Sequence, residues 1–255
     1  MTMDEIQKRD FFSETYETLF SLLWLVLAFL VMDYALSILD MRFEDTWYFM
    51  LLFAPGGMVF WYFFYFKLLE AHKPHRGLIE FAWFAFWVFL LIHLIPVGGS
   101  ELVAILFETA SSETQDQSYW WIGYDMSAMF VFYFPYYLFA TLFPAKLLGR
   151  SDSLRRTLQR VFRQTRYLLP RFFGVFLPIS FLSTSLYTDA QISGSYIPQI
   201  TYSGEPDSFS MLLMVTSGAL YVLGEAVFMV ISKNAYLRDL QEYGDHPEHD
   251  AEVFA

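Results

Sequence analysis

The sequence predicts an all-α integral membrane protein: a polytopic bundle of six transmembrane helices with both termini in the cytoplasm. Hydrophobic residues make up 56% of the chain and charged residues only 17%, whereas soluble domains carry about a quarter charged residues. Apolar runs recur along the chain, each of about 20 residues, the helix length that crosses a bilayer. These runs are apolar all round, while a β-barrel needs alternating strands. A helix is therefore the expected spanning element.

Six apolar runs give the predicted spans. They cover residues 19–39, 47–69, 78–97, 120–142, 169–187 and 209–232. Because the spans and their connections use almost the whole length, we expect one membrane domain over 1–255 and no separate soluble catalytic domain.

The orientation follows from the basic residues. The chain has 16 Lys and Arg residues, and with a cytoplasmic N-terminus only Arg42 falls on the outer side. The outer loops carry acidic residues instead. Basic residues gather in cytoplasmic loops of membrane proteins, so an even number of spans is favoured.

Segments outside the spans have their own patterns. We expect interfacial helices over 4–18, 100–110 and 151–168, and a mobile polar tail over 239–255. In the first segment, Ile6, Phe12 and Tyr16 fall near helical spacing, which predicts an amphipathic approach to the first span. In the second, Ser100 is a plausible N-cap after a Pro and Gly break.

The segment 151–168 predicts a basic amphipathic helix on the cytoplasmic leaflet, directly before the fifth span. Leu154, Leu158 and Phe162 lie on one side of this helix. Five arginines lie mostly elsewhere and are the predicted contacts to anionic lipid: Arg155, Arg156, Arg160, Arg163 and Arg166. Each basic residue near an anionic surface contributes about 1 kcal/mol.

Glu225 is the ionisable residue deepest within a predicted span. It lies between Gly224 and Ala226, small residues that let helices approach closely. Ionisable groups in spans are costly and often functional. Two interpretations stay open: a proton or cation site or ligand counter-ion, and a hydrogen-bonded carboxyl that ties the sixth helix to a neighbour.

Three further polar residues lie in spans. His93, near the end of the third span, is interpreted as a structural histidine, a cofactor ligand or a proton relay. Asp33 and Asp125 lie near outer span ends and are interpreted as interface residues or as the lining of an outer vestibule. The chain has no cysteine and no recognised catalytic motif. We therefore expect no metal, no cofactor and no nucleic-acid partner.

Two sequence patterns leave alternatives open. The aromatic runs over 61–66 and 81–89 are interpreted as packing or lipid-facing surface, or as contacts to a flat pigment, quinone or lipid. The stretches 50–57 and 211–218 read MLLFAPGG and MLLMVTSG, either by chance or as an internal repeat of two three-helix halves.

The stretch SDSLRRTLQRVFRQTRYLLPRFFGVFL, residues 151–177, resembles a pattern in bacterial inner-membrane proteins. These are the six-helix proteins related to the membrane domain of glycerophosphoryl diester phosphodiesterases, in which an Arg-rich amphipathic segment leads into an aromatic span. The resemblance implies the six-span topology and a bacterial inner (plasma) membrane. It implies no catalytic residues in this chain.

Together these features favour a non-enzymatic membrane protein, an accessory, scaffolding or regulatory subunit of a larger complex. Its expected partners are membrane lipids, anionic on the cytoplasmic side, and another protein or a second copy of the chain. A small transporter or channel for an ion, solute or lipid, with Glu225 at its site, is the first alternative. A membrane enzyme acting on lipid or quinone is the second alternative.

Overall fold

The computed structural model describes residues 11–43, 46–72, 77–88, 133–149, 153–196 and 208–243. Within these ranges the secondary structure is helical and contains no strand, so the predicted all-α class is confirmed for this part of the chain. The helices of the N-terminal half are α2 (Phe11–Ser21), α3 (Leu23–Phe43), α4 (Thr46–Leu68), the short η1 (Glu70–His72) and an apolar helix over Leu78–Val88. The later helices are one over 133–139, α7 (Leu142–Leu147), α8 (Leu154–Arg163), α9 (Thr165–Arg171), η2 (Phe172–Phe176), α10 (Leu177–Tyr196) and α11 (Ser208–Tyr243).

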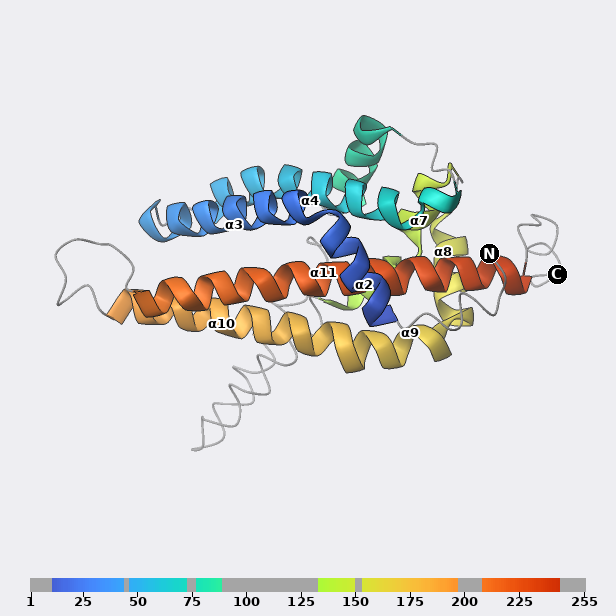
Figure 1. Ribbon diagram of the computed structural model, residues 1–255. Helices are drawn as coiled ribbons and strands as arrows, with labels where there is room; N and C mark the ends of the chain where they lie inside the picture. Colours follow the sequence, from blue (N-terminus) through green and yellow to red (C-terminus); the bar gives the residue numbers. More distant parts are fainter. Residues whose placement is uncertain are drawn as a thin grey trace, which may run out of the picture.

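The long helix α11 is the centre of the bundle. It packs along α10 and also contacts α2, α3, α4 and the elements from α7 to η2 (Figure 1). Each residue from Gly224 to Lys233 is buried. A helix that is buried on every side must be apolar on nearly every side, which explains why the sequence here shows no amphipathic period.

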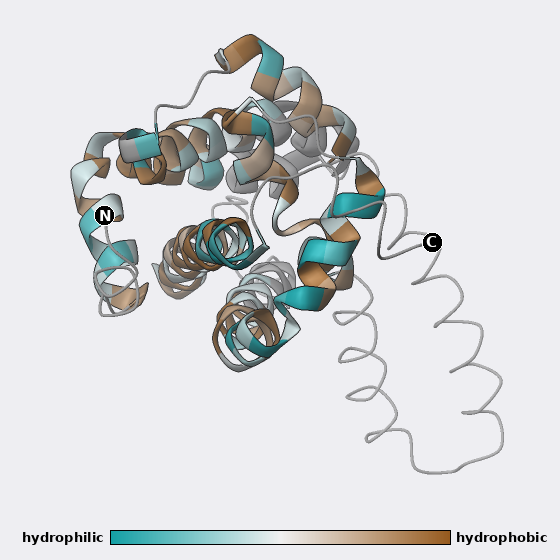
Figure 2. Cartoon of the chain, turned by 90° about the vertical axis from the view of Figure 1, so that its right-hand side faces the viewer, coloured by the Kyte–Doolittle hydropathy of each residue, from teal (hydrophilic) through white to brown (hydrophobic). Residues whose placement is uncertain are grey.

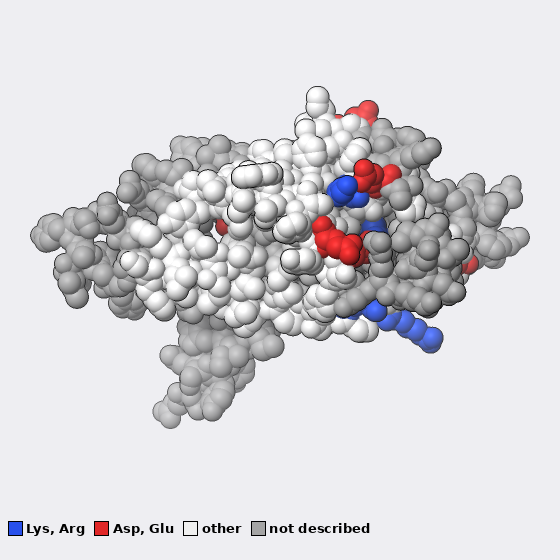
Figure 3. All heavy atoms as spheres, in the orientation of Figure 1, with Lys and Arg blue, Asp and Glu red and all other residues white. Residues whose placement is uncertain are grey.

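Within the residues that the structure describes, two helical segments are long and apolar enough to cross a membrane, Thr165–Tyr187 and Ser208–Tyr243. A third is added if α2 and the start of α3, which are bent by 81° at their junction, form one broken span. On the face drawn in Figure 3, the charged side chains of the described residues gather toward the right-hand end, leaving much of the rest white. Figure 2 views the molecule from that end and shows hydrophilic segments close to the viewer. The chain is therefore a membrane protein.

The predicted first span and the amphipathic segment before it form two separate helices, α3 and α2. α2 continues to Ser21, beyond the predicted end of the interfacial helix at residue 18, and the chain then bends by 81° into α3. If α3 crosses the membrane, a helix at this angle lies nearly in the membrane plane, the position of an interfacial helix. The second predicted span, 47–69, matches α4 to within one residue at each end.

Two predicted boundaries are wrong. α11 does not end near residue 232 but continues to Tyr243, so residues 239–243 belong to a helix and not to a mobile tail. The fifth span begins earlier than predicted, at Thr165, and ends at Tyr187 as predicted, while the helix α10 itself continues to Tyr196. In α11 the reason is packing, since Asp239 and its neighbours are covered by α8 and so are not an exposed polar end.

The basic helix before the fifth span forms two pieces. α8 begins after Ser153, whose side chain accepts a hydrogen bond from the Arg156 backbone N–H at 3.3 Å, as an N-cap residue does. α8 ends at Arg163, and α9 leads into η2, a π-helical segment just beyond Pro170. Proline has no N–H to donate, and π-helical turns of this kind are rare and often mark functional positions.

The aromatic runs divide between the core and the surface. Trp61, Phe64 and Tyr65 of α4 are buried, and the rings of Trp61 and Tyr65 pack against Phe143 of α7. In the helix Leu78–Val88 one side is buried, whereas Trp83 and Trp87 project outward and contact each other at 5.6 Å between ring centroids. Buried side chains of α3, α4, the helices over 78–88 and 133–147, α8, α9, η2 and α11 form one hydrophobic cluster, and partly buried side chains of α10 pack against it.

Several predictions lie outside the described residues. They concern His93, Asp125, the interfacial helix over 100–110, much of the third and fourth spans, and the tail beyond residue 243.

Candidate functional site

Glu225 lies in the middle of α11 and is only 3% exposed. Its carboxyl group accepts side-chain hydrogen bonds from the Trp61 indole of α4 and from the Tyr221 hydroxyl one turn earlier. Within the described residues, the Oε2 atom has no hydrogen-bond partner. Buried polar atoms usually have a partner, so this oxygen marks a position with unused binding capacity.

Aromatic side chains surround this carboxyl group. Trp61 and Tyr136 pack against Phe228, with ring centroids 5.7 and 5.6 Å apart. Tyr65 and Tyr133 lie near enough to interact electrostatically with Glu225. The carboxyl group is therefore set among hydroxyl-bearing rings in a closely packed core.

One glycine and three buried polar residues of α11 follow a seven-residue spacing. Gly218, Glu225, Ser232 and Asp239 are separated by seven residues each and are all buried. Seven residues make almost two helical turns, so these four positions lie along one side of α11. Sequence reasoning noted only Glu225, although this spacing was a signal that could have pointed to Ser232 and Asp239.

Asp33 of α3 meets this side of α11 at Gly218. A Cβ atom added at Gly218 would lie 2.7 Å from Asp33 Oδ2, so the glycine provides the space that the aspartate occupies. The preceding residue, Met32, fills the equivalent space at Gly56 of α4. α3 therefore packs against small residues of both α4 and α11, and both glycines lie within the two similar stretches, whose common origin stays a hypothesis.

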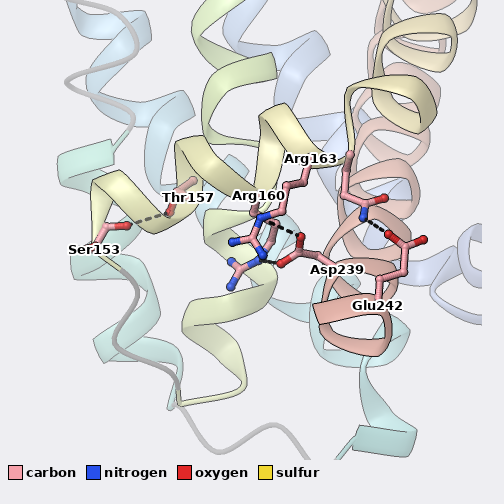
Figure 4. Close-up of polar contacts among 7 residues, drawn as sticks. Ser153, Thr157, Arg160, Arg163, Asp239 and Glu242 are labelled. Atoms are coloured by element: carbon pink, nitrogen blue, oxygen red, sulfur yellow. Dashed lines mark hydrogen bonds and ion pairs between the residues drawn. The ribbon is translucent and has the colours of Figure 1, made fainter. Parts of the chain in front are cut away.

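The C-terminal part of α11 makes a second polar cluster with α8 (Figure 4). The Arg160 Nε donates to Asp239 Oδ2 at 3.0 Å, and Arg163 Nε lies 3.7 Å from Asp239 Oδ1. The Gln164 amide donates to Glu242 Oε2 at 2.8 Å. Burial raises the pKa of the Asp239 carboxyl from its ordinary value, while the positive charges of Arg163 and Arg160 oppose this rise.

The structure changes the interpretation of one predicted lipid contact. Arg160 is 5% exposed and stacks over the Tyr236 ring at 4.6 Å, in addition to its bond to Asp239. It is therefore an internal side chain and not a lipid-facing one. Arg155 and Arg166 are exposed and remain in positions that suit contact with anionic lipid.

A third polar contact joins α2 to α11. Glu14 forms an ion pair with Lys233, which is 6% exposed, and accepts a hydrogen bond from the Asn234 amide at 3.1 Å. Sequence reasoning gave no role to Glu14 or Lys233, because α2 looked like a free amphipathic segment. The contact fixes the bent N-terminal helix against the centre of the bundle.

Of the four intramembrane residues predicted from the sequence, the structure describes two. Asp33 of α3 contacts α11 at Gly218, and Glu225 belongs to α11 itself. Tyr221 lies close enough to interact electrostatically with both carboxyl groups. His93 and Asp125 lie outside the described residues. In the ranges that the structure describes, no group of three His, Cys, Asp or Glu residues is arranged to hold a metal ion.

Comparisons with protein families, with characterised proteins and with solved structures find no match for this chain. Its function is therefore argued from the geometry of its own residues.

Proposed function

We propose that this chain is a non-enzymatic accessory or scaffolding subunit of a larger membrane complex. In this proposal it crosses a bacterial inner membrane six times, with both termini in the cytoplasm, and the exposed arginines of α8 and α9 contact anionic lipid. The observation that supports the proposal best is the use of the internal polar groups, which join helices to one another instead of converging on a reaction centre.

Several buried polar contacts in the bundle connect two different helices. The Trp61 indole ties α4 to Glu225 of α11, and Arg160 ties α8 to Asp239. Ser183 of α10 and Ser217 of α11 donate to each other's backbone carbonyls at 2.9 and 2.8 Å. Hydrogen bonds of this kind hold helices together in lipid, where hydrophobic burial gives little drive for association.

The outward aromatic side of the helix Leu78–Val88 supports binding to another membrane protein. Ile79, Trp83 and Trp87 are 84%, 64% and 51% exposed and follow a spacing of four residues. Aromatic residues, tryptophan above all, are enriched where proteins bind one another. The proposed occupant of this side is a transmembrane helix of the partner protein.

Purification in mild detergent tests this function. The full chain is isolated with its native lipids, and the native mass and the co-purifying proteins are determined. We expect the wild-type chain to purify as a stable complex with a second protein. The double variant Trp83→Ala, Trp87→Ala should lose this complex. The control Trp24→Ala, which removes an exposed tryptophan from α3, should keep it. A chain that purifies alone would contradict the accessory role.

A second candidate function, transport of a small cation or a proton, is favoured by a specific observation. Glu225 Oε2 has no partner among the described residues, and Asp33 and Ser232 extend the polar side of α11 in both directions. A purely structural carboxyl would be expected to satisfy both of its oxygens.

A further inference from the structure

We propose that Glu225 is a proton-binding site in the middle of the membrane, reached from the outer side through Asp33 and Tyr221 and from the cytoplasmic side through Tyr65 and Ser232. This inference goes beyond the accessory role and rests on the second candidate function.

The close packing around the Glu225 carboxyl group favours a proton as the ligand of this site. Trp61, which donates to the carboxyl group, packs closely against other rings, with centroid distances of 4.7 Å to Phe143 and 5.7 Å to Phe228. A proton needs no additional space, whereas a hydrated cation or an organic solute does. A bare carboxylate is costly in such surroundings, and protonation at Oε2 removes the charge.

The outer half of the path runs through Asp33 and Tyr221. Asp33 touches α11 at Gly218, and Tyr221 follows Gly218 by three residues and precedes Glu225 by four. Residues three and four apart are neighbours on one side of a helix. The Tyr221 hydroxyl bonds to Glu225 and interacts electrostatically with Asp33, so it lies between the two carboxyl groups.

The cytoplasmic half runs through a tyrosine of the neighbouring helix. Tyr65 of α4 is fully buried, faces Ser232 and interacts with Glu225. The Ser232 hydroxyl donates to the Phe228 carbonyl at 2.6 Å. The next residue, Lys233, is paired with Glu14 of α2. The path therefore ends next to the buried ion pair that joins α2 to α11.

The length of this path suits a membrane. The fourteen steps along the helix from Gly218 to Ser232 correspond to about 21 Å at 1.5 Å per residue, against a hydrocarbon thickness of about 30 Å. The remaining distance lies near the two interfaces, where water is available.

The step itself is a simple acid–base exchange. A proton from the outer side is passed to Oε2 and gives the neutral acid, and release of a proton toward Ser232 restores the carboxylate. One positive charge crosses the membrane for each proton, with no oxidant or reductant. The other groups that face Glu225 are Tyr133 and Tyr136 of the helix over 133–139. These two tyrosines belong neither to the outer half nor to the cytoplasmic half of the path. We therefore expect their hydroxyls only to change the rate of the proton exchange at Glu225.

Proton flux into vesicles tests the proposal. The full chain is placed in vesicles of phosphatidylethanolamine and phosphatidylglycerol with a trapped pH-sensitive dye, and valinomycin with a potassium gradient sets the potential. We expect the wild-type chain to acidify the vesicles, Glu225→Gln to match protein-free vesicles, and Tyr65→Phe to be slower. Tyr62→Phe, the same change on the Phe81 side of α4, should keep the wild-type rate.

An infrared measurement separates the site from the fold. The carbonyl band of a protonated carboxylic acid should change with pH in the wild-type chain, and this component should be missing in Glu225→Gln, with unchanged elution and melting temperature. Wild-type flux equal to that of empty vesicles, or undiminished flux in Glu225→Gln, would overturn the proposal. The accessory role is judged separately, because co-purification of a partner with Glu225→Gln does not depend on flux.

Discussion

Arg160 of α8 and Asp239 of α11 form a buried ion pair with a distance of 3.0 Å between Nε and Oδ2, although 79 residues separate them in the chain. Both side chains are at most 6% exposed. The pair fixes the basic helix α8 to the C-terminal end of α11. It also explains why α11 continues as a helix well beyond its apolar part.

We expect Arg160→Met to destabilise the protein by about 3 kcal/mol, because removal of one partner leaves a buried charge without full compensation. Arg163 remains 3.7 Å from the other carboxylate oxygen and limits the loss. The measurement is reversible unfolding by denaturing detergent in mixed micelles. Arg166→Met, a change at an exposed arginine on α9, should stay within about 0.5 kcal/mol of wild type.

The double variant Arg160→Met, Asp239→Leu completes this test. Replacement of a buried ion pair by apolar side chains is often neutral, so the double variant should be more stable than Arg160→Met alone. Additive losses in the two single variants would show that the pair contributes no coupling energy.

The exposed arginines should bind anionic lipid, whereas Arg160 should not. Arg155 and Arg166 project outward from α8 and α9, and each is expected to contribute about 1 kcal/mol near an anionic surface. Arg155→Gln with Arg166→Gln should therefore lower the retention of phosphatidylglycerol about tenfold or more in native mass spectrometry. Retention of phosphatidylcholine should not change. Equal losses of both lipids would indicate general unfolding.

The sequence predicted the features of the fold that depend on local pattern. Apolar runs of membrane length predicted helices, and α4 begins and ends within one residue of the expected bounds. The amphipathic segment before the first span appears as α2. These features follow from composition and period, which act over a few residues.

The predictions that failed concern residues whose contacts lie far away in the sequence. Asp239 belongs to a polar stretch that resembles an exposed tail, and only its contact with Arg160 shows that it is internal. Glu225 was found from its position in a span, but its partner Trp61 looked like one of many aromatic residues of α4. No local pattern distinguishes an arginine that meets lipid from one that meets a carboxylate on another helix.

The reciprocal hydroxyl contact between α10 and α11 should make a small, measurable contribution to stability. Ser183 and Ser217 each donate to the backbone carbonyl of the other, and interhelical hydrogen bonds in membranes contribute about 0.6 kcal/mol on average. Ser183→Ala should lose about this amount in the detergent unfolding experiment. Thr216→Val, which removes a hydroxyl bonded within its own helix, should cost less.

Gly218 should tolerate a methyl group poorly, because the added Cβ would lie 2.7 Å from Asp33 Oδ2 and 3.6 Å from Leu30. We expect Gly218→Ala to destabilise the protein by about 1–3 kcal/mol, the usual cost of overpacking. Gly57→Ala is the matched control, since no atom lies within 4 Å of the added Cβ. Asp33→Ala in the Gly218→Ala background should restore part of the stability, because it removes the atoms that clash. Equal effects of the two glycine variants would show that Asp33 does not occupy the space at Gly218.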